Sequence, residues 1–185
     1  MFRIGLSGTN WTGKTDTICR FVEEHPKLDI EIVSLSDLVA RSPFPMEEDQ
    51  TLEGSQWMTE QVRTLSNKAN GEIQVFDRTP LDILAFTLYA EKKTGSKDTS
   101  VFETILELVR CFDIIFYLQV SNEWPANTPR NHHKIEFARK MDLYIRKAIE
   151  QFALDVVSLP WDIAERQRLL SEHLSRLSIA CKGGR

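Results

Sequence analysis

Short apolar runs alternate with longer mixed segments along this chain, and the runs have the length of buried strands. Five of them predict strands, at residues 2–6, 29–35, 73–76, 113–120 and 153–159. The run at 113–120 (DIIFYLQV) is apolar nearly throughout, as expected of a parallel strand that is covered on both faces. The segments between the runs predict helices, at residues 14–25, 36–40, 54–70, 80–93, 101–110, 134–152 and 161–179.

This alternation predicts an α/β fold, a parallel sheet with helices on both faces and right-handed crossovers. Pro26 ends the first helix, and Pro80 opens another at its first turn. Polar connections are expected at 42–53, 94–100 and 121–133, and the tail from 180 to 185 is expected to fray. The sequence has no repeat and no linker, so we expect one domain over residues 1–185.

The composition is that of an ordinary globular protein, with 185 residues, 42% apolar and 27% charged. A net charge of −4 provides no overall basic field, so nucleic acid is a possible but not a favoured partner. Cys19, Cys111 and Cys181 lack metal-ligand spacing and are expected to be free, buried thiols. With neither a signal peptide nor a membrane-spanning run expected, we predict a cytoplasmic protein, and a homodimer remains possible.

The first connection carries the most specific motif, Gly8-Thr9-Asn10-Trp11-Thr12-Gly13-Lys14-Thr15. It fits the P-loop pattern and lies between a predicted strand and a predicted helix, as this motif requires. Its backbone N–H groups would surround phosphate oxygens, Lys14 would reach the β- and γ-phosphates, and the Thr15 hydroxyl would bind Mg²⁺. The residues expected to bind ATP and Mg²⁺ are Gly8, Asn10, Trp11, Thr12, Gly13, Lys14, Thr15 and Asp16.

A second polar motif, Asp77-Arg78-Thr79-Pro80-Leu81-Asp82, follows the third predicted strand. Its first residues emerge at the carboxyl edge of the sheet, where ligands bind in open α/β folds. Asp77 can hold Mg²⁺ or accept a proton from an attacking hydroxyl, and Arg78 can bind a substrate phosphate or sugar oxygen. The alternative is a structural role, with Asp77 as a helix cap and Arg78 in a surface ion pair.

Together these motifs resemble the P-loop nucleoside and nucleotide kinase-like families. These include thymidylate kinases, deoxynucleoside kinases and the AAA-type ATPase/kinase family that contains nicotinamide riboside kinase domains. The resemblance covers nearly the whole chain and implies a three-layer α/β/α fold with a five-stranded parallel sheet in the order 2-3-1-4-5. It also implies that Asp77 is a base or metal ligand, that Arg78 contacts the substrate, and that a helical lid at about 121–146 follows the fourth strand.

In such kinases, lid arginines close over the phosphates and neutralise charge during transfer. Arg130, Arg139 and, as a weaker candidate, Lys134 are predicted to do so here. The alternative is surface ion pairing of Arg139 or Arg146 with Asp142, since these residues lie three and four positions apart on one predicted helix. Two adjacent histidines stand at 132–133, with no cluster of acidic or cysteine residues near them in the sequence. We therefore expect a solvated loop there rather than a metal site.

The acceptor side is expected to be formed by the end of the second strand, the connection 42–53 and the helix that follows. Asp37, Trp57 and Gln61 are the candidates for substrate binding, together with Arg78. Asp37 could bind a ribose hydroxyl or a base edge, and Trp57 could stack on a base. Helix capping by Asp37 and packing by Trp57 are the structural alternatives.

The leading hypothesis is therefore ATP-dependent phosphoryl transfer to a small acceptor such as a nucleoside, a nucleotide or a related metabolite, with Lys14, Asp77, Arg78, Arg130 and Arg139 as catalytic residues. Two alternatives remain. One is a kinase that acts on a modified base in DNA. The other is a nucleotide-binding switch or regulatory ATPase without a small-molecule acceptor.

Overall fold

The computed structural model describes residues 1–68, 71–120 and 132–182. Its elements follow one another as β1 (Phe2–Ser7), α1 (Lys14–Glu24), β2 (Ile30–Ser34), α2 (Leu35–Arg41), the 3₁₀ turn η1 (Glu47–Asp49), α3 (Leu52–Asn67), β3 (Ile73–Asp77), α4 (Pro80–Thr94), α5 (Thr99–Val109), β4 (Ile114–Leu118), α6 (His132–Gln151), β5 (Val157–Leu159) and α7 (Ile163–Lys182). The strands form a five-stranded sheet in the order β2-β3-β1-β4-β5, with every pair parallel. The predicted fold class and strand order are confirmed.

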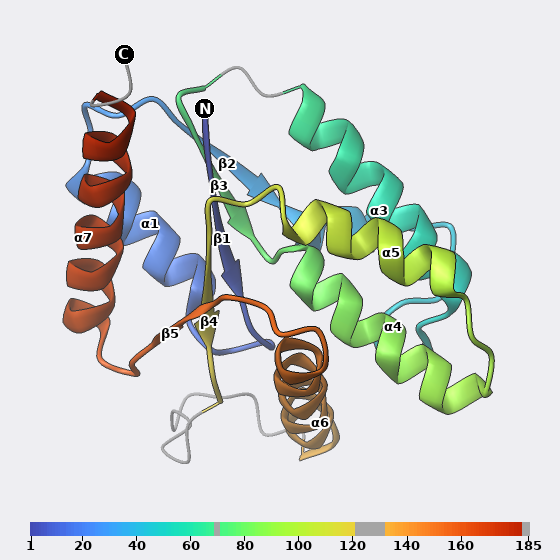
Figure 1. The fold of residues 1–185 in the computed structure, drawn as a ribbon. Coiled ribbons are helices and arrows are strands. Elements are labelled where there is room, and N and C mark those ends of the chain that lie inside the picture. The colour runs from blue at the N-terminus through green and yellow to red at the C-terminus, as the bar shows by residue number, and fades with distance from the viewer. Residues whose placement is uncertain (69–70, 121–131, 183–185) are drawn as a thin grey trace.

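Two hydrophobic clusters attach helices to opposite faces of this sheet (Figure 1). On one face, Leu6 and Phe116 pack with Phe21 of α1 and Leu170 of α7. On the other face, a larger cluster joins α2, α3, α4, α5 and α6 to the sheet around Phe76. The three central strands β1, β3 and β4 are buried at their centres, which explains why their sequences are mostly apolar runs rather than alternating ones, whereas the edge strand β2 exposes Ile32.

The parallel register brings the carboxyl ends of the central strands together. Leu6 of β1 is opposite both Asp77 of β3 and Phe116 of β4, and Ser34 at the end of β2 is also opposite Asp77. The turn after β3 stays attached to β1, because the Arg78 N–H donates to the Leu6 carbonyl at 3.0 Å. The P-loop and the Asp77-Arg78 motif therefore meet at one edge of the sheet.

Several predicted boundaries were wrong. The fifth strand was predicted over 153–159, but β5 is only Val157–Leu159, because the chain is still turning away from α6 at Ala153, where φ is 47°. Helix α3 begins earlier than predicted, since the Thr51 hydroxyl caps it by accepting from the Gly54 N–H at 3.1 Å. Helix α6 begins at His132, inside the predicted connection, and residues 121–131 and 183–185 lie outside the described part.

The expectation about the cysteines was partly wrong. Cys19 and Cys111 are free thiols, as predicted, but both are exposed rather than buried. They lie on the solvent-facing side of α1 and just after α5, because the apolar positions that face the sheet are occupied by residues such as Ile18 and Leu108. The side chain of Cys181 lies outside the described part. Within the described residues, no helix is long and apolar enough to cross a bilayer.

We expect Gly5→Ala to destabilise the fold. A Cβ at Gly5 would lie 2.4 Å from Thr79 Cγ2 and 3.1 Å from the Phe112 ring, and Thr79 cannot move freely because it caps α4. The free energy of unfolding should fall by about 1–3 kcal/mol, as for other overpacked sites. Thr79→Ser removes the clashing methyl group and keeps the hydroxyl, so the double variant should recover part of the loss in denaturant unfolding. Equal destabilisation of the single and double variants would contradict this explanation.

Candidate functional site

The P-loop turns sharply between β1 and α1, and left-handed backbone makes the turn. Gly8, Trp11 and Gly13 have φ of 147°, 63° and 84°. At Gly8 only glycine fits, because a Cβ there would lie 2.6 Å from the Leu118 carbonyl oxygen. Helix α1 then starts without a side-chain cap, unlike α3, α4 and α5. Its first N–H groups therefore remain available for an anion, and the helix dipole favours negative charge at the same place.

Lys14 is almost completely buried beneath this turn, with 6% of its surface exposed. Its Nζ donates to the Thr9 carbonyl at 2.7 Å, which holds the side chain back along the loop. The pKa of Lys14 is lowered from 10.5 to about 8, chiefly by burial and then by the positive charge of Arg78, while Asp82 and Asp77 partly oppose the shift. The ammonium group is thus destabilised in the free protein, and a bound phosphate would supply the negative charge that it lacks.

Asp77 and Thr15 lie together at the start of α1. Thr15 Oγ1 donates to Asp77 Oδ2 at 2.5 Å, and Asp77 is 7% exposed at the end of β3. A hydroxyl and a carboxylate at this distance form a hard-oxygen pair of the kind that Mg²⁺ uses when phosphates and water complete its shell. The two residues predicted as metal ligands are therefore close together. No cluster of three or more acidic, histidine or cysteine ligands occurs among the residues that the structure describes.

Asp82 connects the P-loop to the turn before α4. Oδ1 accepts from the Gly8 N–H at 3.0 Å, and Oδ2 accepts from the Thr79 N–H at 2.8 Å. Thr79 itself caps α4 and its hydroxyl is 2.5 Å from Ser7 Oγ. The alternative role of Asp77 as a helix cap is therefore wrong, because Thr79 and Asp82 form the cap. The spacing Thr79-x-x-Asp82 is a capping-box signal that was present in the sequence.

Two hollows lie at this edge of the sheet, and Arg78 lines both of them. Its φ is 71°, which turns the chain from β3 into α4, and its Nη2 donates to Asn10 Oδ1. One hollow, which we call the P-loop hollow, is lined by Asn10, Trp11, Gly13, Lys14, Thr15, Asp16, Ser36, Asp77 and Arg78. Trp11 thus borders the phosphate side of the site.

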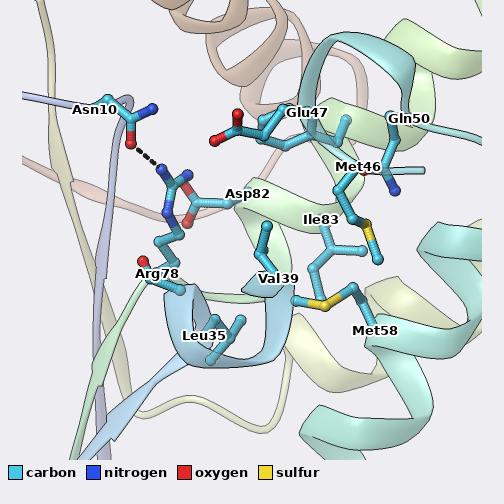
Figure 2. A pocket seen from close by; sticks show the side chains of 12 residues that line it. Asn10, Leu35, Val39, Met46, Glu47, Gln50, Met58, Arg78, Asp82 and Ile83 are labelled. Atoms are coloured by element: carbon cyan, nitrogen blue, oxygen red, sulfur yellow. Dashed lines mark hydrogen bonds between the residues drawn. The ribbon is translucent and has the colours of Figure 1, made fainter. Parts of the chain in front are cut away.

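The second hollow, which we call the lateral pocket, lies among α2, η1, α3 and α4 (Figure 2). It is lined by Asn10, Leu35, Ser36, Val39, Met46, Glu47, Gln50, Met58, Arg78, Asp82, Ile83 and Phe86. Its walls are mostly apolar, and its polar groups come from the P-loop, α2, the connection before α3, the β3–α4 turn and the start of α4. Asn10, Ser36 and Arg78 line both hollows, which are therefore adjacent.

Three of the four predicted substrate-binding residues do not line the lateral pocket, whereas the fourth, Arg78, does. Asp37 is exposed on α2, and Gln61 is half-buried on α3. Trp57 packs against the larger hydrophobic cluster, as its structural alternative anticipated. Neighbouring positions line the pocket instead, and Glu47 and Gln50 belong to the long connection 42–53. The unusual length of that connection was the available signal, but it could not indicate which of its residues face inward.

The predicted lid residues are only partly described. Arg130 lies outside the described residues, and Arg139 and Lys134 are exposed on α6. Arg146 and Asp142 form an ion pair at 3.3 Å, as the structural alternative predicted. It is not a surface ion pair, however, because only 3% of the Asp142 side chain is exposed.

Asp142 also fixes the end of β4 to α6. It accepts from Tyr117 Oη at 2.6 Å and from the Val120 N–H at 3.2 Å. Burial, followed by this hydrogen bond and the charge of Asp142, raises the pKa of Tyr117 well above its usual value. His133 does not take part in a metal site among the described residues, and its Nε2 lies 2.6 Å from Glu48 Oε2.

Arg166 of α7 is a P-loop neighbour that the sequence did not indicate. It is buried, and its guanidinium donates to the carbonyls of Thr12 at 3.0 Å and Pro160 at 2.7 Å. Its charged carbon lies 5.2 Å from the centre of the Trp161 ring. Burial lowers the pKa of Arg166. Nothing in the local pattern of α7 distinguishes this arginine from the exposed Arg168 two positions later.

Comparison with known families agrees with this geometry. The model of the family described as "AAA domain" matches residues 3–166, which is most of the chain. The chain belongs to this family. The predicted resemblance to P-loop proteins of the kinase-like type is thereby confirmed at the level of family and fold. No curated protein matches the chain.

Three solved structures with a similar fold are of deoxyadenosine kinase from M. mycoides. The structure with the products dCMP and a flexible dCDP has a TM-score of 0.61 and 16% identity to this AAA domain. The structures with bound dATP and with bound dCTP have TM-scores of 0.58 and 0.59 and identities of 17% and 16%. Each alignment covers 95% of this chain and 100% of the kinase chain. At these identities the likeness shows the fold alone.

Nucleotide binding by this AAA domain should be coupled to proton uptake. At about pH 8.5 a Lys14 with a pKa of about 8 is mostly neutral, and bound phosphates will raise that pKa and protonate it. Calorimetry of ATP binding in buffers of different ionisation enthalpy should therefore detect uptake of a large fraction of one proton. Lys14→Arg keeps its charge at this pH, so its residual binding should show no uptake. Equal uptake by both proteins would contradict the assignment to Lys14.

Asp82→Asn should destabilise the fold by about 2–3 kcal/mol, because one backbone N–H would face an amide NH₂ in place of a carboxylate oxygen. Denaturant unfolding measures the loss. Asp98→Asn is the matched control: Asp98 caps α5 at the surface, where asparagine caps equally well, so unfolding should change little. If Asp82→Asn were as mild as the control, the two hydrogen bonds would not be important for stability.

Proposed function

We propose that the protein transfers the γ-phosphoryl group of ATP to a small acceptor, such as a nucleoside, a nucleotide or a related metabolite. The observation that carries this proposal is the adjacency of the two hollows. Asn10, Ser36 and Arg78 line both, so a γ-phosphate on Lys14 would face a molecule in the lateral pocket. Hydrolysis by a nucleotide switch or a regulatory ATPase needs only the P-loop hollow, whereas a kinase also needs an adjacent cavity for its acceptor.

In this proposal, the loop amides and Lys14 bind the phosphates, and Arg78 faces the transferred group between donor and acceptor. Thr15 and Asp77 would hold Mg²⁺, which supplies neutralisation of the phosphate charge when it is bound. Catalysis would come chiefly from positioning and from positive charge at the phosphates. Arg130 and Arg139 remain our candidates for lid residues that complete the site from α6 and the segment before it.

The lining of the lateral pocket supports an acceptor with a flat, partly apolar group. Met46, Met58 and Phe86 supply adaptable or aromatic apolar surface, and Gln50 and Ser36 supply hydrogen-bonding groups at its margins. Gln50 is buried and is held by a hydrogen bond from its Nε2 to Ser55 Oγ at 3.1 Å. A nucleobase with its sugar fits this chemistry, and the deoxyadenosine kinases of similar fold favour the same class of acceptor.

The test is release of ADP from ATP–Mg²⁺ with a panel of nucleosides, nucleotides and nicotinamide riboside. We expect release to depend on the acceptor, and Lys14→Met to reduce kcat by at least about 10²-fold, as the loss of a transition-state charge contact usually does. Removal of the buried charge should leave the fold intact, which a melting curve of the variant would verify.

Other outcomes would support other functions. Release of ADP that is the same with and without every acceptor would favour a regulatory ATPase. Phosphorylation of a modified base in single- or double-stranded DNA, but of no free nucleoside, would favour a DNA-base kinase. Full turnover in purified Lys14→Met would contradict P-loop catalysis altogether.

A further inference from the structure

Four carboxylates border the lateral pocket and the P-loop hollow, and three of them are already engaged. Asp16 borders the P-loop hollow and forms an ion pair with Arg20 at 3.3 Å. Asp77 accepts the Thr15 hydroxyl hydrogen bond at 2.5 Å, next to the proposed metal position. Asp82 uses one oxygen for the Gly8 N–H and the other for the Thr79 N–H, and it is 3% exposed. Asp16 and Asp77 do not line the lateral pocket, and Asp82 could take a proton from a molecule there only by giving up a contact that maintains the site.

The fourth carboxylate, Glu47, is different. It lines the lateral pocket, yet no hydrogen bond or ion pair to its carboxylate occurs within the described part of the chain. Figure 2 shows its carboxylate pointing toward the side of the pocket where Arg78 and Asn10 lie. It thus faces the side from which a γ-phosphate on Lys14 would approach an acceptor.

The backbone at Glu47 is held in a conformation that a free loop would avoid. Its φ is 58°, in the left-handed region that non-glycine residues rarely adopt. The next residue fixes this turn from two helices, since the Glu48 carbonyl accepts from Tyr89 Oη at 3.0 Å and from Lys93 Nζ at 2.8 Å, and its carboxylate contacts His133 of α6. Strain that surrounding contacts maintain in this way is concentrated at functional positions.

The charges around the lateral pocket indicate which kind of acceptor group it can receive. Among the described residues that line it, Arg78 is the only cation, whereas Glu47 and Asp82 are anions. A phosphate acceptor would place a dianion next to the Glu47 carboxylate, and Arg78 alone would have to compensate the negative charge of both groups. A hydroxyl acceptor is neutral and carries the proton that a carboxylate can remove.

We propose that Glu47 is the general base of the reaction and that the acceptor group is therefore a hydroxyl rather than a phosphate; this proposal rests on the phosphoryl transfer proposed above. The acceptor O–H proton passes to the Glu47 carboxylate as the acceptor oxygen forms its bond to the γ-phosphorus. The bond from that phosphorus to the β–γ bridging oxygen breaks, and ADP leaves with the electron pair. Glu47 then releases the proton to water.

The experiment compares Glu47→Gln with the matched control Glu53→Gln, six positions later in the sequence. Glu53 is exposed in the first turn of α3 and does not line the pocket. With a nucleoside acceptor, Glu47→Gln should lower kcat by about 10²–10⁴-fold with little change in KM and should abolish the acidic limb of the pH–rate profile. Glu53→Gln should match the wild type. Glu47→Gly should lose activity to the same extent. Its melting temperature should not fall, because glycine adopts the left-handed backbone conformation without strain.

Binding provides a readout that does not need turnover. Calorimetry should give tighter binding of a nucleoside than of its 5′-monophosphate to wild-type protein, and Glu47→Gln should improve binding of the monophosphate specifically. Phosphorylation of a monophosphate in preference to a nucleoside, or an unchanged kcat in Glu47→Gln, would overturn this inference while the kinase proposal stands. ADP release that ignores every acceptor, with no monophosphate effect in Glu47→Gln, would overturn both.

Discussion

A single buried carboxylate, Asp82, joins the two turns on which the candidate site depends. Through Gly8 it fixes the entrance of the P-loop, and through Thr79 it fixes the start of α4 and the turn that carries Asp77 and Arg78. A buried charge of this kind is stable only when hydrogen bonds satisfy it, so its position is determined by the two N–H groups. Asp82 therefore helps to fix the geometry between Lys14 on one turn and Arg78 on the other, together with the Ser7–Thr79 hydroxyl contact and the hydrogen bond from the Arg78 N–H to the Leu6 carbonyl.

Backbone strain is concentrated around the same place. Of the four non-glycine residues with positive φ in the described chain, Trp11, Arg78 and Glu47 line the two hollows, and only Ala153 lies elsewhere. Left-handed backbone costs roughly 1–2 kcal/mol at each such residue. Local sequence does not favour these conformations, so tertiary contacts such as those at Glu48 must impose them. Packing on α4 and α6 thus helps to form the lateral pocket.

The donor half of the site could be predicted from the sequence because its chemistry depends on local spacing. The P-loop needs Gly8, Gly13, Lys14 and Thr15 at fixed separations, and the register of parallel strands brings Asp77 beside them. The central strands β1, β3 and β4 were predictable because burial on both faces leaves mostly apolar runs in the sequence. The acceptor half has no such spacing: Trp57 and Gln61 lie on the helix next to the pocket, but the helix rotation presents Met58 instead. Arg166 reaches the P-loop from 154 residues away in sequence, and no local pattern records that contact.

Burial disfavours the positive charges beside the P-loop, and at Lys14 the carboxylates of Asp82 and Asp77 oppose this effect only in part. Burial lowers the pKa of Lys14, and the guanidinium of Arg166 donates its hydrogen bonds mainly to neutral carbonyl oxygens rather than to a carboxylate. Such an arrangement opposes the stability of the empty protein and favours the phosphate-bound one, because the ligand supplies the missing counter-charge. The lateral pocket differs in its charged groups, because its described lining residues include two carboxylates and one arginine. Anionic and neutral ligands are thus directed to different halves of one continuous site, as the donor and a hydroxyl acceptor of phosphoryl transfer require.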